Sequence, residues 1–262
     1  LGKVLLILFF ASYLMRNEDE INNPKFIIQT AILAAIPLAL IVKEPDLSTT
    51  IVTFLIIASL MFVTGLSYKL VGIVLGITIP AIAILLLVIV NKGSSILQGY
   101  QSLRILAWLK PEEYPETAYQ QQNSIMAIGS GQFFGKGLYN NSVDSVKNGN
   151  YISEPHTDFI FSVAGEEMGF LGSVLIILLL LFIVYECIQT AKVAKDLSGK
   201  LICSGMAALV GFQSFVNICV VTGLFPNTGL PLPFVSYGLT SLVTMYFGMG
   251  FVLNVGLQAK KY

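Results

Sequence analysis

Charged residues are scarce in this chain of 262 residues. They make up 11% of it, whereas hydrophobic residues make up 55%, and the mean hydropathy is +0.78. A soluble domain has about 25% charged residues, so the composition excludes an ordinary water-soluble protein and indicates a polytopic membrane protein. The 15 basic and 15 acidic residues cancel, and no net positive field favours a nucleic acid as partner.

Histidine and cysteine, which often bind metal ions, are also scarce. The chain has one histidine and three cysteines, and the cysteines lie in or beside apolar runs. Their spacing matches neither a metal site nor a disulfide framework. We therefore expect Cys187, Cys203 and Cys219 to be small packing residues.

Seven apolar segments are candidates for membrane-spanning helices. A span needs about 20 apolar residues, and only helices and closed barrels satisfy the backbone groups in lipid. The runs lack the period of two that barrel strands show. The sequence therefore predicts an all-α, polytopic transmembrane helical bundle. Its segments are 1–14, 26–42, 47–66, 70–90, 159–185, 201–224 and 234–257.

Lysine and arginine set the predicted orientation. Eight of them lie in the short loops and span ends on one side of the predicted membrane, and two lie in those on the opposite side. Cytoplasmic loops carry the excess of these residues, so the first set is predicted to be cytoplasmic. The polar segment 91–157, Asp46, Asp158 and the proline-rich stretch 225–233 then all lie on the outer side.

The outer segment 91–157 is too long to serve only as a connection between two spans. Apolar residues at helical spacing between Tyr100 and Leu109 predict a short amphipathic helix at the membrane surface, with Trp108 at headgroup level. A tight turn region is predicted further on, marked by Gly129, Gly131, Gly135 and Gly137.

Four acids lie within the fourteen positions from Glu154 to Glu167, at the boundary between the polar segment and the next apolar run. Ionisable groups inside a membrane cost roughly 2.5–3.5 kcal/mol each and usually serve a function. On a helix, Asp158 heads a stripe of small residues and so faces the bundle, either as a base or as a helix N-cap. Glu166 is either a site residue or a structural acid that faces a loop cation. The stripe comprises Ser162, Gly165, Gly169 and Gly172.

Other outer-side residues are candidates for contact with an anionic substrate. Arg104 and Lys136 are either the cations that a diphosphate requires or solvated loop charges. Asp46 precedes a helix and is at least a candidate N-cap. The three prolines in 225–233 exclude a plain helix there and predict a rigid outer turn.

Four motifs, in order, resemble those of the SEDS family of membrane proteins, which includes RodA, FtsW and SpoVE. PDLST at 45–49 resembles the family's PDLGT, and AIGSGQFFGKGL at 127–138 resembles iGSGGlfGkGl. SEPHTDFIFSVAGEEMGFLG at 153–172 resembles pE-htDFiFaviGEElGflG, and FPNTGLPLPFVSYGLTS at 225–241 resembles PxTGxxLPFvSyGGSS. The resemblance covers essentially the whole chain.

The resemblance implies a ten-span fold in which the seven segments here are the fourth to tenth spans, so about three spans would precede them. Residues 1–262 would form a single integral membrane domain, with one long extracellular loop between Val90 and Asp158. The chain departs from the family pattern at Ser48, Gln132 and Leu239–Thr240.

The resemblance further implies a peptidoglycan glycosyltransferase in the bacterial cytoplasmic membrane. It would polymerise lipid II, a disaccharide peptide on undecaprenyl diphosphate, beside a class B penicillin-binding protein. The family's essential aspartate maps onto Asp158, the expected general base. Arg104 and Lys136 would bind the diphosphate, with or without a divalent cation such as Mg²⁺ or Mn²⁺. Further expected substrate contacts are Asp46, Glu166, Ser236 and Tyr237.

Two other functional classes stay open at this point. A lipid II flippase would use charges along a path through the membrane and would need no outer base. A non-catalytic scaffold for the penicillin-binding protein would tolerate the replacement of Asp158 by asparagine.

The orientation is testable by thiol labelling. In a chain without its native cysteines, Ser142→Cys should react with a membrane-impermeant reagent in intact cells, because it lies in the outer segment. Ser198→Cys lies at a predicted cytoplasmic end and should react only after the cells are permeabilised. Labelling of Ser198→Cys in intact cells would overturn the orientation.

Overall fold

The computed structural model describes residues 1–44, 46–74, 76, 80, 84, 87–88, 99–138, 145 and 155–258. Within these ranges the regular structure is helical and no strand occurs, which confirms the predicted all-α class. Among the described residues, five helices are long and apolar enough to cross a membrane. They are α2 (Pro24–Lys43), α3 (Leu47–Thr64), α7 (Ile160–Val193), α8 (Leu197–Val221) and α9 (Leu239–Leu257).

Three shorter helices complete the comparison with the sequence. Helix α1 (Gly2–Arg16) coincides with the first predicted segment, and α5 (Gly99–Leu109) is the predicted amphipathic helix. A further helix, α6 (Pro115–Ser130), lies in the outer segment. The predicted span 70–90 and much of 91–157 lie outside the described residues, so the count of seven spans stays a prediction.

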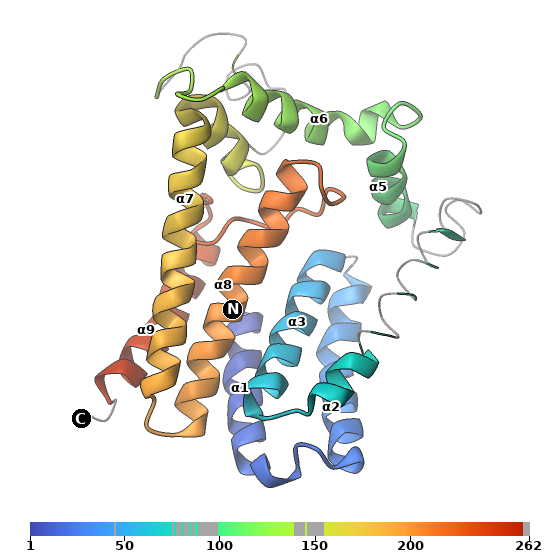
Figure 1. The fold of residues 1–262 in the computed structure, drawn as a ribbon. Helices are drawn as coiled ribbons and strands as arrows, with labels where there is room; N and C mark the ends of the chain where they lie inside the picture. The colour runs from blue at the N-terminus through green and yellow to red at the C-terminus, as the bar shows by residue number, and fades with distance from the viewer. Residues whose placement is uncertain are drawn as a thin grey trace. The chain divides into compact units, whose positions relative to one another are not determined.

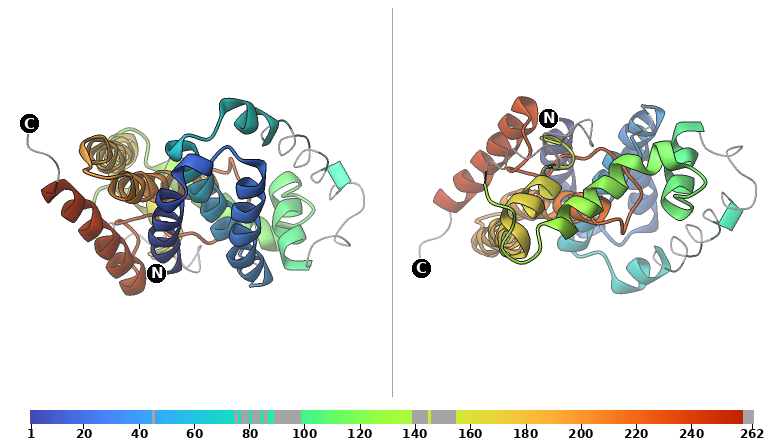
Figure 2. Two further views of the ribbon diagram at one scale, coloured as in Figure 1. Left: turned by 90° about the horizontal axis from the view of Figure 1, so that it is seen from below. Right: turned by 90° about the horizontal axis from the view of Figure 1, so that it is seen from above.

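The chain divides into two compact units, and the first comprises residues 1–93, 183–210 and 244–262. Helices α1, α2 and α3 lie side by side in it (Figures 1 and 2). Small residues allow close helix approach, as at Gly205 of α8, where an added Cβ would lie 2.6 Å from Ile7 of α1. Asp46 caps α3, since its Oδ1 accepts a hydrogen bond of 2.9 Å from Thr49 N. Local sequence predicted this cap correctly.

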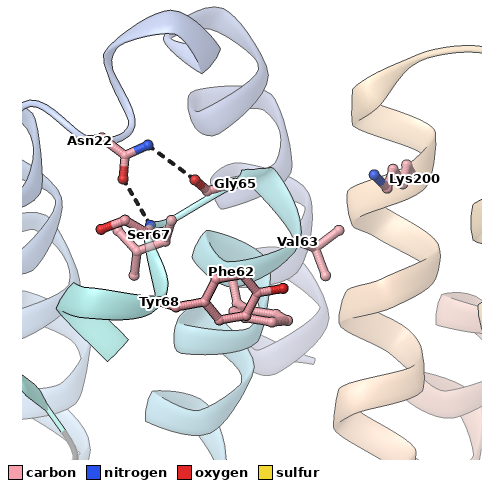
Figure 3. Close-up of a pocket in the computed structure, with 8 residues that line it drawn as sticks. Asn22, Phe62, Val63, Gly65, Ser67, Tyr68 and Lys200 are labelled. Atoms are coloured by element: carbon pink, nitrogen blue, oxygen red, sulfur yellow. Dashed lines mark hydrogen bonds between the residues drawn. The ribbon is translucent and has the colours of Figure 1, made fainter. Parts of the chain in front are cut away.

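The first unit also contains a cavity of about 530 Å³ at the end of α3. Gly65 ends this helix in the left-handed conformation, with a φ of 115°. Asn22 fixes the turn that follows, because it donates to Gly65 O and accepts from Ser67 N (Figure 3). The lining is largely apolar and includes Phe62 and the lysine Lys200, and no candidate site residue lines the cavity.

The second unit comprises residues 94–182 and 211–243. In it, α6 packs on the first part of α7, where Ser124 Oγ hydrogen-bonds to Ser162 Oγ and also donates to Val221 O. An added Cβ at Gly165 would lie 3.2 Å from Ile128 of α6. The first half of the small-residue stripe therefore allows a helix to approach, as predicted.

Helix α7 is interrupted at Gly169, which has φ 64° and ψ −160°. In Figure 1 the ribbon of α7 turns sharply near its upper end. The prediction of one uninterrupted helix over 159–185 is therefore wrong at this point. Beyond the break the stripe ends, since Gly172 meets the side chain of Met168 from its own helix. The break also leaves main-chain groups on both sides without partners inside the helix.

Residues 131–137, here called the glycine-rich loop, supply those partners. Two loop amides donate to carbonyls before the break, and two amides after the break donate to loop carbonyls. Unpaired groups in an apolar region would each cost several kcal/mol. The four bonds are Lys136 N to Glu166 O (2.9 Å), Gly137 N to Glu167 O (3.0 Å), Phe170 N to Gln132 O (2.9 Å) and Leu171 N to Phe133 O (3.3 Å).

The close approach of the loop to α7 requires glycine at two positions. A Cβ at Gly131 would lie 1.9 Å from Gly165 O, and a Cβ at Gly135 would lie 2.2 Å from Glu167 O. Gly135 also has a φ of 81°, which favours glycine. The glycine motif therefore holds α7 together across its break.

A pair of alanine variants tests this role of the loop. Gly131→Ala should lower the Tm of the purified protein by about 5 °C, because the methyl group displaces the loop from α7. Gly129→Ala is the control, since an added Cβ there meets nothing within 4 Å. It should leave the Tm unchanged or slightly raised, because alanine favours a helix over glycine by about 1 kcal/mol. Equal Tm values for the two variants would contradict the role of the loop.

Candidate functional site

Asp158 lies in the turn that leads into α7, and its side chain is half-buried. Its main-chain carbonyl accepts a hydrogen bond of 2.8 Å from Asn217 Nδ2 of α8. The same amide donates to Leu230 O at 2.6 Å. Gly229 faces the carboxyl group, because an added Cβ there would lie 3.3 Å from Asp158 Oδ2. The carboxyl group of Asp158 is thus placed against the segment that joins α8 to α9.

This segment, residues 222–238, is called the proline-rich segment below. It is non-helical, as the prolines predicted, and α9 starts at Leu239 and not at the predicted Phe234, which has a φ of 64°. Side chains of α6, of α8 and of the segment itself form hydrogen bonds with its main-chain groups. These bonds include Gln213 Nε2 to Pro231 O (2.9 Å), Gln121 Nε2 to Phe225 O (2.6 Å) and Leu232 N to Ser236 Oγ (2.6 Å).

Helix α5 contacts the same segment through two side chains. Arg104 Nη1 donates to Asn227 O at 3.2 Å, and Trp108 Nε1 donates to Gly223 O at 2.8 Å. Arg104 therefore reaches a residue two positions before Gly229, which faces Asp158. A cation and a carboxylate that are far apart in the sequence thus converge on residues 227–229.

Lys136 and Glu166 form an ion pair with a distance of 2.8 Å between Nζ and Oε1. The Glu166 side chain is 1% exposed and that of Lys136 is 31% exposed. Ser145 Oγ adds a bond of 3.4 Å to the other carboxylate oxygen. Of the two alternatives for Glu166, the structure favours an acid facing a loop cation, and the pair strengthens the attachment of the glycine-rich loop to α7. Removal of one partner from a buried pair leaves an uncompensated charge.

The remaining predicted site residues have different surroundings. Ser236 is 2% exposed and donates to Thr157 O at 2.6 Å, so its hydroxyl holds the turn that carries Asp158. The Tyr237 side chain is exposed, while its main-chain N donates to His156 O. Asp46 belongs to the first unit, where its carboxylate caps α3 and also interacts with the charge of Lys3.

Sequence reasoning missed the amide side chains that organise this region. Asn217, Gln213 and Gln121 are each less than a tenth exposed and donate to main-chain carbonyls. Two of them lie in the apolar run of α8. A buried amide without a partner is costly. Amide residues in such a run therefore indicate that main-chain groups unpaired within a helix lie nearby.

The arrangement around Asp158 suits proton transfer and binding of an anion. A half-buried carboxylate can accept a proton from a hydroxyl group, and a guanidinium group can stabilise negative charge that develops nearby. Within the described ranges, no three side chains of histidine, cysteine, aspartate or glutamate gather into a metal site.

Curated relatives of the chain are named as probable peptidoglycan glycosyltransferases FtsW. The protein from Geobacter sulfurreducens (strain DL-1 / KN400) is 34% identical over 263 residues, which cover 99% of this chain and 67% of the relative. That from Buchnera aphidicola subsp. Schizaphis graminum is 33% identical over 264 residues, which cover 98% and 71%. The chain thus spans about two thirds of the length of these relatives.

Solved structures and a family model agree with these relatives. Rod shape determining protein RodA of Thermus thermophilus matches with a TM-score of 0.62 and 26% identity, over 99% of this chain and 66% of that chain. A structure of a peptidoglycan synthase complex matches with a TM-score of 0.75 and 29% identity, over 99% and 69%. The family model for FtsW, RodA and SpoVE, described as cell cycle protein, matches residues 1–261. The chain therefore belongs to this family of multi-pass membrane proteins, as its motifs indicated.

Proposed function

We propose that the protein is a peptidoglycan glycosyltransferase that elongates glycan strands from lipid II at the outer face of the bacterial cytoplasmic membrane. One observation carries the proposal most directly. Asp158 and Arg104 reach the same short stretch, residues 227–229, from distant parts of the sequence. The names of the FtsW relatives support the same activity.

The reaction joins the 4-hydroxyl of one sugar to the anomeric carbon of another. The new bond links this oxygen to the anomeric carbon, and the bond between that carbon and the diphosphate oxygen breaks. Asp158 takes the hydroxyl proton as general base. The diphosphate leaves with the bonding electrons, and Arg104 stabilises its charge. Attack from the face opposite the diphosphate inverts the anomeric centre.

The other predicted contacts take supporting positions in this proposal. Lys136 is bound to Glu166 and Ser236 is bound to Thr157, so both hold the scaffold around the reacting groups. The exposed Tyr237 side chain is placed to contact the sugar or lipid of a substrate. A divalent cation such as Mg²⁺ or Mn²⁺ would, when bound to the diphosphate, add to the charge that Arg104 supplies.

We further propose a class B penicillin-binding protein as partner. The matching chain in one solved structure is part of a peptidoglycan synthase complex that coordinates polymerization and crosslinking. A glycosyltransferase supplies the polymer in such a complex, and a penicillin-binding protein would supply the crosslinking activity.

The central experiment measures glycan polymer formed by the purified full-length protein from lipid II. Asp158→Asn should reduce the rate by about 10²–10⁴, because it keeps the size of the side chain and removes the basic oxygen. Glu112→Gln, an exposed acid between α5 and α6, is the control and should leave the rate unchanged.

Two outcomes would count against this function. A rate for Asp158→Asn within a factor of about three of wild type would exclude a general base at this position. Movement of lipid II across vesicles by the wild-type protein, with no polymer formed, would favour the flippase.

Arg104→Ala tests the diphosphate contact. Turnover should fall by about tenfold or more while the amount of folded protein stays close to wild type, because a charge-assisted bond to the leaving group is lost. Lys110→Ala is the matched control, since Lys110 is exposed and pairs with Glu113 at 2.9 Å. Equal polymer yields from the two variants would remove Arg104 from the site.

A further inference from the structure

Asn217 joins two main-chain segments that are distant in the sequence. It lies on α8, is 2% exposed, and donates from Nδ2 to Asp158 O at 2.8 Å and to Leu230 O at 2.6 Å. One carbonyl belongs to the turn before α7, and the other belongs to the proline-rich segment. This buried amide therefore helps to fix the spacing between these two segments, beside the bonds from Ser236 Oγ to Thr157 O and from Tyr237 N to His156 O.

We propose that Asn217 is a positioning residue for Asp158: its two amide hydrogens hold the Asp158 turn beside Leu230, so that the carboxyl group of Asp158 lies against Gly229. This inference rests on the proposed function, because it assigns Asn217 a role in the glycosyl transfer that Asp158 starts. Asn217 acts through Asp158 and needs no contact with the substrate.

The orientation of the amide is fixed by its surroundings. If the group were rotated by 180°, its oxygen would face two carbonyl oxygens, which repel it. In the orientation observed, Asn217 Oδ1 is buried and has no partner among the described residues. Leaving a buried acceptor unpaired costs free energy. The two hydrogen bonds of the NH₂ group must offset this cost in the observed orientation.

Gly229 shows what the spacing achieves. Gly229 has a φ of 70°, and an added Cβ there would lie 3.3 Å from Asp158 Oδ2, so the lack of a side chain leaves room beside this oxygen. Gly229 is exposed, and Asp158 is half-buried. The position of Leu230 relative to the Asp158 turn therefore sets how much room a hydroxyl group has beside this side of the carboxylate. A displacement of about 1 Å in such a geometry can cost about 10² in rate.

A double-mutant cycle separates positioning from general stability. Asn217→Leu should lower kcat by about 10² with little change in KM in the wild-type background. In the Asp158→Asn background the same change should lower the residual rate by less than about threefold, because the group that it positions is already lost. Single-turnover measurements with labelled lipid II are sensitive enough to measure the low rates of the Asp158→Asn background.

Gln213→Leu is the matched control in the same cycle. Gln213 lies one turn earlier on α8, is also 2% exposed, and donates to Pro231 O at 2.9 Å. Its loss should lower the rate by the same factor in both backgrounds. A 10²-fold effect of Asn217→Leu that persists in the Asp158→Asn background would overturn the positioning role, and so would a rate of Asn217→Leu within threefold of wild type.

Hydrogen exchange gives a readout that does not depend on activity. In Asn217→Leu, amides of residues 156–160 in the turn should exchange about tenfold faster than in wild type, whereas Gln213→Leu should leave them unchanged. Unaltered exchange in Asn217→Leu would overturn the proposal even if the protein proved inactive on lipid II. Absence of polymer from wild type together with the faster exchange would instead contradict the proposed function and keep the Asn217 contact.

A second pair of variants perturbs the same geometry from the other side. Gly229→Ala places a methyl group beside Asp158 Oδ2, whereas Gly223→Ala, at a φ of 80°, places one against Ile125. Both variants strain the backbone of the proline-rich segment, but only Gly229→Ala should lower kcat by about 10². Similar losses in the two variants would contradict the importance of the spacing at Asp158.

Discussion

The second unit depends on one constraint, which is that main-chain polar groups away from water need hydrogen-bond partners. Two stretches break the regular helical pattern there, namely the interruption of α7 at Gly169 and the proline-rich segment. The glycine-rich loop supplies partners on both sides of the break. Buried amide side chains do the same for the proline-rich segment. These bonds pair main-chain groups that no regular helix pairs in these stretches.

The candidate site is a consequence of those bonds. Asn217 holds the Asp158 turn beside the proline-rich segment, and Arg104 holds the same segment from α5. The buried pair of Lys136 and Glu166 attaches the glycine-rich loop to α7 only eight residues beyond Asp158. Reacting groups on backbone that is fixed in this way are preorganised. Preorganisation of this kind supplies much of the rate enhancement in such sites.

The features that sequence predicted well are those that depend on local pattern. Long apolar runs predicted the five apolar helices of the described residues, and the position of Asp46 before one of them predicted the cap of α3. The break at Gly169 was missed because a glycine does not by itself mark a break. Gly165 lies in the same helical pattern and keeps helical backbone. The role of Asn217 was missed because its partners lie 59 and 13 residues away along the chain. Such contacts follow from the tertiary fold and leave no periodic signal.

Disulfide trapping in native membranes tests the central claim, that the glycine-rich loop bridges the break in α7. Gln132→Cys and Phe170→Cys, in a chain without native cysteines, should crosslink readily on mild oxidation, because Phe170 N lies 2.9 Å from Gln132 O. This bond brings the two main chains together, and disulfides form between cysteines whose Cα atoms lie about 4.4–6.8 Å apart. Gln132→Cys with Leu175→Cys, beyond the break, should not crosslink. Crosslinking of the control pair, or failure of the first pair in folded protein, would contradict the account.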